Sequence, residues 1–87
     1  MSDYLVVFAR SAEKELDSLP VEISSRISPR INALADSPRP PGCVKLKAKQ
    51  NQWRIRVGDY RVIYSINDTT FTVKILEVNH RRQVYER

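Results

Sequence analysis

Hydrophobic and polar residues alternate with a period of two through most of the second half of the chain. The alternating runs are Val44–Lys49, Trp53–Val57, 60–66 and 70–78, and two-residue breaks at Gly58-Asp59 and Asn67-Asp68 separate the last three. A period of two is typical of β-strands, and short breaks rich in Gly, Asn and Asp are typical of hairpin turns. The second half is therefore predicted to form successive hairpin strands.

The first half shows one short strand pattern and then a helical period. The β-rich run Tyr4–Phe8 predicts a first, largely buried strand, and Ser11 is expected to cap a helix that ends at Pro20. Val21–Asp36 is predicted to be a second helix, with Pro29 kinking it. Apolar residues recur along it at spacings of four, four and three and form one core-facing stripe: Ile23, Ile27, Ile31 and Leu34.

The segment Ser37–Gly42 is the obvious linker, because its three prolines and glycine cannot continue a helix. It is too short to separate two domains, so residues 1–87 are expected to form a single domain. The predicted class is α+β, in the order β-α-α-β-β-β(-β). A curved, mostly antiparallel sheet should be covered on one face by the two-helix hairpin.

The hairpin at Gly58-Asp59 has a register that can be counted. With a two-residue turn, Val57 lies opposite Tyr60 and Arg56 lies opposite Arg61. Alternate positions share a face. The core face should carry Trp53, Ile55, Val57, Tyr60, Val62, Tyr64, Phe71, Val73 and Ile75. The other face should carry Arg54, Arg56, Arg61, Ile63, Ser65, Thr72 and Lys74.

Arg56 directly opposite Arg61 is unfavourable for stability, because like charges across a strand pair repel. Sequences break such local rules mostly where function requires it. An anionic ligand between the two guanidinium groups would turn this repulsion into binding. The structural alternative is that both side chains extend into solvent, or that Asp59 or Glu77 neutralises them.

Charge and length support a polyanion-binding surface. The 87 residues carry 15 Lys+Arg against 10 Asp+Glu, a net charge of +5. Residues 1–43 hold five basic and six acidic residues, whereas residues 44–87 hold ten and four, so the whole excess lies in the second half. This asymmetry suits RNA, DNA or an acidic protein, although a solvated basic surface that only maintains solubility is the alternative. So short a chain favours a shallow surface site over a deep cavity.

Cysteine and histidine content excludes several kinds of site. With only Cys43 and His80, we expect neither an internal disulfide nor a metal, and no cofactor. Cys43 more often packs at a strand edge than acts as a nucleophile. Histidine is the residue type best suited to proton transfer near neutral pH, but a lone histidine such as His80 is more often structural than catalytic. No signal peptide or membrane span is visible, so a soluble cytoplasmic protein is expected.

Several stretches together resemble the RelE/ParE superfamily of bacterial toxins. The resemblance covers nearly the whole chain: the first strand, the helix pair around Leu19-Pro20, Leu46–Lys49, the run Trp53–Tyr64, and the closing His80–Tyr85. An arginine followed by Val-Tyr at the end is similar to the RelE branch rather than to the gyrase-poisoning ParE branch. The resemblance implies a ribosome-dependent, metal-independent mRNA endonuclease. In RelE toxins the 2′-OH attacks the adjacent phosphate and gives a 2′,3′-cyclic phosphate.

The resemblance also implies roles for individual residues. The matching catalytic positions are Arg54, Arg56, Arg61, Arg81 and Tyr85, with Arg82 as an alternative to Arg81. Further RNA contacts are expected from Lys45, Lys47, Lys49, Lys74, His80 and Arg82. RelE enzymes often carry lysines where this chain has Arg54 and Arg56, and an arginine in a protein cannot act as a general base. The base is therefore open among Tyr85, His80, Lys47 and Lys49, or catalysis depends on alignment and phosphate clamping alone.

The partners implied are a cognate antitoxin, the ribosome with its mRNA, and operator DNA for the toxin–antitoxin complex. A segment with acidic and apolar side chains could fold as it wraps the basic sheet. Two other readings stay open. One is a ParE-like protein that inhibits DNA gyrase by binding, and the other is a degenerate toxin kept as an antitoxin-binding co-repressor.

Overall fold

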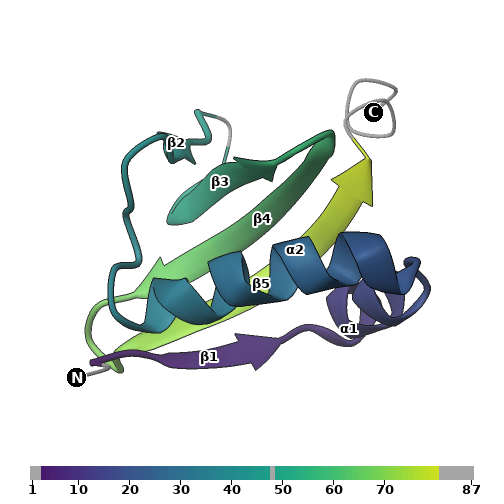
Figure 1. The fold of residues 1–87 in the computed structure, drawn as a ribbon. Helices are drawn as coiled ribbons and strands as arrows, with labels where there is room; N and C mark the ends of the chain where they lie inside the picture. Colours follow the sequence, from purple (N-terminus) through teal and green to yellow (C-terminus); the bar gives the residue numbers. More distant parts are fainter. Residues whose placement is uncertain (1–2, 48, 81–87) are drawn as a thin grey trace.

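The computed structural model describes residues 3–47 and 49–80, and these form a five-stranded sheet with two helices on one side (Figure 1). The helices are α1 (Arg10–Asp17) and α2 (Val21–Asn32), followed by the 3₁₀ turn η1 (Ala33–Ala35). The strands are β1 (Leu5–Phe8), β2 (Val44–Lys45), β3 (Gln52–Val57), β4 (Tyr60–Asn67) and β5 (Thr72–His80). The sheet order is β1-β5-β4-β3-β2, and only β1 and β5 are parallel. The predicted α+β class is confirmed.

The core lies between the helices and one face of the sheet. Ile27 and Ile31 of α2 are fully buried, and Leu34 of η1 is 1% exposed. They pack in one cluster with the buried strand residues Ile55, Val57, Val62, Tyr64, Ile66, Val73, Ile75 and Val78. The predicted stripe on α2 is therefore the core-facing stripe, with Ile23 partly buried at its start.

β1 is less buried than predicted. It lies at the edge of the sheet, where β5 is its only partner strand among the described residues, and Leu5 is 65% exposed. The other three residues of the strand are half-buried. One side of an edge strand has no neighbouring strand to pair with. The apolar side chains of β1 are therefore covered on one side only and stay partly exposed.

The first helix begins at Arg10, with Ala9 rather than Ser11 at its N-cap. The Ala9 N–H still donates to the Ile75 carbonyl at 2.8 Å, so the parallel pairing with β5 ends only there and the helix starts directly afterwards. The Ser11 hydroxyl lies inside the helix and donates to the Leu76 carbonyl at 3.5 Å. The prediction of Ser11 as the cap was wrong, because tertiary pairing sets where the strand ends.

The second helix begins at Val21, as the sequence indicated, and Pro20 occupies its N-cap. It continues past Pro29 as far as Asn32, and the last turn tightens into η1 over Ala33–Ala35. The helical segment therefore reaches nearly to the predicted end at Asp36, but it changes its hydrogen-bonding pattern after Asn32. No helix within 3–47 or 49–80 is long and apolar enough to cross a membrane.

The strand predicted over Val44–Lys49 is reduced to the two residues of β2. Val44 pairs with Arg54 and Lys45 pairs with Trp53, and the Leu46 N–H donates to the Gln52 carbonyl at 2.9 Å. The chain turns back before β3, and Asn51 at the end of this turn has φ 58°. β3 begins only at Gln52, so the residues after Lys45 have no strand beside them with which to pair. The alternating pattern alone does not make them a strand.

The last strand contains an irregularity that the sequence did not reveal. Ile63 pairs with Glu77, whereas the next residue of β4, Tyr64, pairs with Ile75, so Leu76 is an extra residue in β5. One inserted residue exchanges the two faces of the strand beyond it. Phe71, predicted to be core, precedes β5 with φ 53° and is 54% exposed. Its ring instead makes an edge contact with Tyr4 at 5.5 Å.

Candidate nucleic-acid interface

The β3–β4 hairpin has the predicted register throughout. Val57 pairs with Tyr60, Arg56 with Arg61, and Trp53 with Tyr64. Gly58 in the turn has φ 61°, a conformation that glycine adopts without strain. The two-residue turn therefore sets the pairing, and Arg56 and Arg61 lie side by side on the same face.

The arginines lie on the sheet face opposite the helices. The helices pack against the face formed by Ile55, Val57, Val62 and Tyr64, and alternation places the arginines on the other face. This open face can be described as three rows of paired residues across β3, β4 and β5. The rows are Arg56–Arg61–Asn79, Arg54–Ile63–Glu77, and Gln52–Ser65–Lys74.

The two facing arginines differ in exposure. Arg56 is exposed, Arg54 is half-buried, and Arg61 is only 6% exposed. Arg61 lies in the middle strand, so its long side chain is surrounded by neighbours from both sides. Packing restricts the orientations of the Arg61 side chain. A guanidinium group that is already held in one orientation loses less conformational entropy when it binds a ligand.

A carboxylate lies on the same face. Glu77 is diagonal to Arg61 on the neighbouring strand, a relation that corresponds to roughly 7–8 Å between backbone positions. The amide of Asn79, itself 3% exposed, donates to the Glu77 carboxylate at 2.8 Å. Sequence reasoning missed Asn79 and named Glu77 only as a possible neutralising group, because strict alternation over β5 would have put both on the core face. Nothing in the residue pattern marks Leu76 as the bulge.

His80 lies on the helix side, away from the arginines. It pairs with Tyr60, whose ring packs edge-on against the imidazole at 5.3 Å. Together they line a small hollow of about 180 Å³ that Glu15, Ser18 and Leu19 also border. The expectation that His80 joins the RNA-contacting face is therefore wrong in its geometry, and the bulge at Leu76 is the reason.

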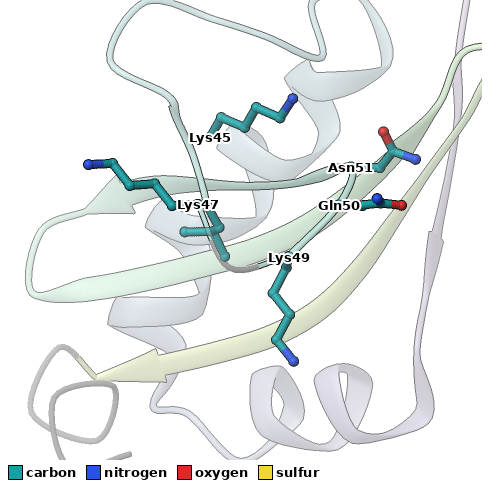
Figure 2. Close-up of a pocket in the computed structure, with 6 residues that line it drawn as sticks. Lys45, Lys47, Lys49, Gln50 and Asn51 are labelled. Carbon is teal, nitrogen blue, oxygen red and sulfur yellow. The ribbon is translucent and has the colours of Figure 1, made fainter.

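The predicted lysines are distributed over two regions. Lys74 pairs with Ser65 and lies on the open face, as predicted. Lys45 pairs with Trp53 and therefore lies on the helix side, with its Nζ 5.7 Å from the centre of the indole ring. Lys47 and Lys49 belong to the turn between β2 and β3, where their side chains are exposed (Figure 2).

The closing residues lie outside the described part of the chain. This applies to Arg81, Arg82 and Tyr85, so their predicted roles stay predictions. β5 ends at His80 opposite Tyr60, at the end of the sheet that carries Arg56 and Arg61.

A separate polar cluster fastens the proline-rich linker to the other end of β4. Arg39 forms an ion pair with Asp68 at 2.9 Å, and the Tyr4 hydroxyl donates to the same carboxylate at 2.6 Å. Arg39, with help from Tyr4, holds the pKa of Asp68 below its usual value. The Tyr64 hydroxyl donates to the Pro38 carbonyl at 2.8 Å, and burial raises the pKa of Tyr64. This cluster is structural, because its charges are already matched within the protein.

Known proteins resemble this chain over nearly its whole length. The family model described as "ParE toxin of type II toxin-antitoxin system, parDE" matches residues 6–85. Toxin RelG of Mycobacterium tuberculosis is 32% identical over 85 residues, which are 97% of this chain and 98% of that protein. Toxin RelE3 of Methanocaldococcus jannaschii is 33% identical over 87 residues, covering 93% of this chain and 94% of that protein.

Solved structures agree with these sequence matches. The toxin chain in the archaeal RelE–RelB complex from Pyrococcus horikoshii superposes with a TM-score of 0.80 at 33% identity, covering 91% of this chain and 96% of that one. The RelBE2 toxin–antitoxin complex of Mycobacterium tuberculosis contains a chain with a TM-score of 0.78 at 30% identity, covering 91% and 99%. The chain therefore belongs to the RelE/ParE superfamily of type II toxins, and its relatives place it with the RelE toxins.

Proposed function

We propose that this RelE-family toxin is a ribosome-dependent endoribonuclease that cuts mRNA and thereby stops translation. The observation that carries the proposal is the placement of Arg54, Arg56 and Arg61 on the sheet face opposite the helices. Guanidinium groups on neighbouring strands suit a ribose–phosphate backbone, because each can donate two hydrogen bonds to one phosphate.

The reaction we propose is transesterification within the RNA. The 2′-OH attacks the adjacent phosphorus, the bond to the 5′ oxygen of the next nucleotide breaks, and the products are a 2′,3′-cyclic phosphate and a 5′-OH. A proton leaves the 2′-OH and another is delivered to the departing oxygen. Negative charge accumulates on the phosphoryl oxygens in the transition state. Arg56 and Arg61 would stabilise that charge, and Arg54 would orient the neighbouring backbone. No step of this reaction needs a metal.

We propose that the proton acceptor is one of the residues named from the sequence other than His80. Arginine stays protonated in proteins, and His80 lies on the helix side against Tyr60. Of the candidates named from the sequence, Tyr85, Lys47 and Lys49 are left, and Arg81 is expected to share the phosphate with Arg61. Alignment of the 2′-OH and clamping of the phosphate would supply the rest of the rate enhancement.

We also propose that a cognate antitoxin covers the toxin when growth continues. The related toxins from Pyrococcus horikoshii and Mycobacterium tuberculosis were crystallised as complexes with their antitoxins. An acidic antitoxin segment complements the net charge of +5 and would occupy or distort the open face. The ribosome with its mRNA, and operator DNA for the complex, are the other partners we propose, in the cytoplasm.

The test is cleavage of ribosome-bound mRNA by the purified toxin, with cut sites mapped by primer extension. Arg56→Ala is the main variant, because Arg56 is exposed and its removal should not disturb folding. Arg30→Ala, on the exposed side of α2, is the matched control. Arg61 is 6% exposed, so Arg61→Lys, which keeps the charge and loses the planar fork, accompanies it. Wild-type cleavage that Arg56→Ala abolishes and Arg30→Ala retains supports the proposal. Accumulation of gyrase-cleaved DNA with intact mRNA would instead assign the chain to the ParE mode of action.

A further inference from the structure

An amide and a carboxylate on β5 form a hydrogen-bonded pair beside Arg61. The Asn79 carboxamide donates to Oε1 of Glu77 at 2.8 Å, and Asn79 is 3% exposed. Asn79 pairs with Arg61 across the strands, and Glu77 pairs with Ile63. Both residues therefore belong to the three rows of the open face, where Glu77 is the single carboxylate. The reaction proposed above uses neither of them.

The bulge at Leu76 brings this pair to the open face. Without the extra residue, strict alternation would turn the Glu77 and Asn79 side chains toward the helices. The first helix fixes this half of the strand, because the Glu15 carboxylate accepts a hydrogen bond from the Val78 N–H at 2.9 Å. The backbone between Glu77 and Asn79 is therefore held by α1 as well as by its pairing with β4.

A glutamate at this position can compete with a phosphate for Arg61. Glu77 and Arg61 are diagonal neighbours, and diagonal positions on adjacent strands lie roughly 7–8 Å apart, which two long side chains can bridge. A carboxylate and a phosphate bind a guanidinium group through the same paired hydrogen bonds, so one excludes the other. Because Arg61 is 6% exposed, solvent screens its charge poorly and this competition is strengthened.

The hydrogen bond from Asn79 opposes a movement of the Glu77 carboxylate toward Arg61. If the carboxylate left, the buried amide would lose its acceptor, and an unsatisfied buried polar group is costly. Packing alone does not explain an amide at a position that is 3% exposed, since an apolar side chain would fill the same space without needing a partner.

We propose that Asn79 is a positioning residue, which restrains the Glu77 carboxylate and so limits its competition with an RNA phosphate for Arg61. Asn79 acts through Glu77 and touches no reacting atom. This inference rests on the proposed function, because it assumes that Arg61 binds a phosphate of the RNA.

The test is a double-mutant cycle on RNA affinity. Asn79→Leu removes the donor with little change of volume, and it is measured alone and in the Glu77→Gln background. The probe is a fluorescent single-stranded oligoribonucleotide with 2′-O-methyl groups throughout, which cannot be cleaved through the 2′-OH. Asn32→Leu, at the exposed end of α2, is the matched control, and urea denaturation checks that each variant folds.

Asn79→Leu alone should lower affinity by about fivefold at low salt, and the loss should shrink as salt is raised. In the Glu77→Gln background the same substitution should change affinity by less than about 1.5-fold, because the competing charge is already gone. The control should stay within the same limit. A loss that persists in the Glu77→Gln background would show that Asn79 acts only on the structure of β5 and would overturn the inference, as would unchanged affinity in Asn79→Leu.

If Asn79→Leu does not fold, NMR on the wild type decides. The carboxamide protons of Asn79 should stay protected from exchange with water when the oligonucleotide is added. Faster exchange would show that the hydrogen bond breaks on binding, which would contradict the inference.

Cleavage of ribosome-bound mRNA separates the two proposals. Normal cleavage by the wild type without coupling between Asn79 and Glu77 would refute this inference alone. Coupling in the binding cycle with no cleavage of any mRNA would support the inference and refute the proposed nuclease. A wild type that does not bind the oligonucleotide would overturn the inference, and the cleavage assay would then decide the proposed function by itself.

Discussion

The two ends of β4 carry opposite arrangements of arginine. At the Asn67 end, Arg39 lies 2.9 Å from Asp68, and the Tyr4 hydroxyl completes the carboxylate's hydrogen bonds. At the Tyr60 end, Arg61 is paired across the strands with Arg56. The first arrangement neutralises charge and fastens a linker. The second places two cations side by side across a strand pair on the face opposite the helices, an arrangement that suits an anionic ligand.

Exposure sharpens this comparison. The structural pair is open to solvent, with 41% and 58% of the Arg39 and Asp68 side chains exposed, whereas Arg61 is 6% exposed. Exposed ion pairs contribute little to stability, and buried charges are costly unless their surroundings compensate them. Arg61 is therefore enclosed by the packed sheet, whereas Arg39 is held at the surface.

The largest expected effect is on the Tyr60 end. Arg56→Ala should lower the rate of mRNA cleavage by about 10²–10³-fold, which is typical for removal of one donor that stabilises transition-state charge. Single-turnover cleavage on saturating ribosome–mRNA complexes measures it. Stability should change little, because Arg56 is exposed and its removal relieves the repulsion with Arg61. A variant with full activity would show that the facing arginines are not the reaction site.

Tyr64→Phe tests the linker attachment from the core side. Loss of the hydrogen bond to the Pro38 carbonyl should lower the free energy of unfolding by about 1 kcal/mol, measured by urea denaturation at neutral pH. Because burial raises the pKa of Tyr64 above its ordinary value of 10.0, the folded state keeps the proton while the unfolded state loses it. Wild-type stability should therefore fall as the pH rises above about 10, and this part of the fall should be absent in Tyr64→Phe.

Glu77→Gln tests whether the carboxylate on the open face opposes RNA binding. The amide oxygen can still accept the hydrogen bond from Asn79, so the change removes charge with little change of shape. Affinity for a non-cleavable single-stranded RNA should rise by about two- to fivefold at low salt, the scale of one partly screened charge pair. The gain should shrink as salt is raised. Weaker binding would mean that Glu77 positions Arg61 rather than competing with the phosphate.

The smallest expected effect is on the Asn67 end. Arg39→Gln should leave mRNA cleavage within about twofold of wild type, because an exposed pair contributes little and lies far along β4 from Arg61. The same variant should show a smaller acid-side contribution from Asp68, because the Tyr4 hydroxyl still donates to its carboxylate. In wild type that contribution is present above the ordinary carboxylate pKa and is lost as the pH falls through the lowered pKa of Asp68. A strong loss of cleavage would contradict the division between the two ends.

The accuracy of the sequence predictions follows the range of the interactions involved. The β3–β4 register was predicted correctly because one two-residue turn and strict alternation determine it. Phe71, His80 and Asn79 were misplaced or missed because their positions depend on the turn after β4 and on the bulge at Leu76. The strand expected over Val44–Lys49 is only two residues long in the structure, because β3 pairs with Val44 and Lys45 alone.

Residue order alone determined the α+β class, the core stripe of α2 and the pairing of Arg56 with Arg61, because these depend on local periodicity and on one short turn. Tertiary structure alone decided the start of α1, the bulge in β5 and the helix-side position of His80. It also decided that Arg61 is buried while Arg56 is exposed. Each of these features depends on how strands far apart in the chain pair and pack, and no window of neighbouring residues contains that information.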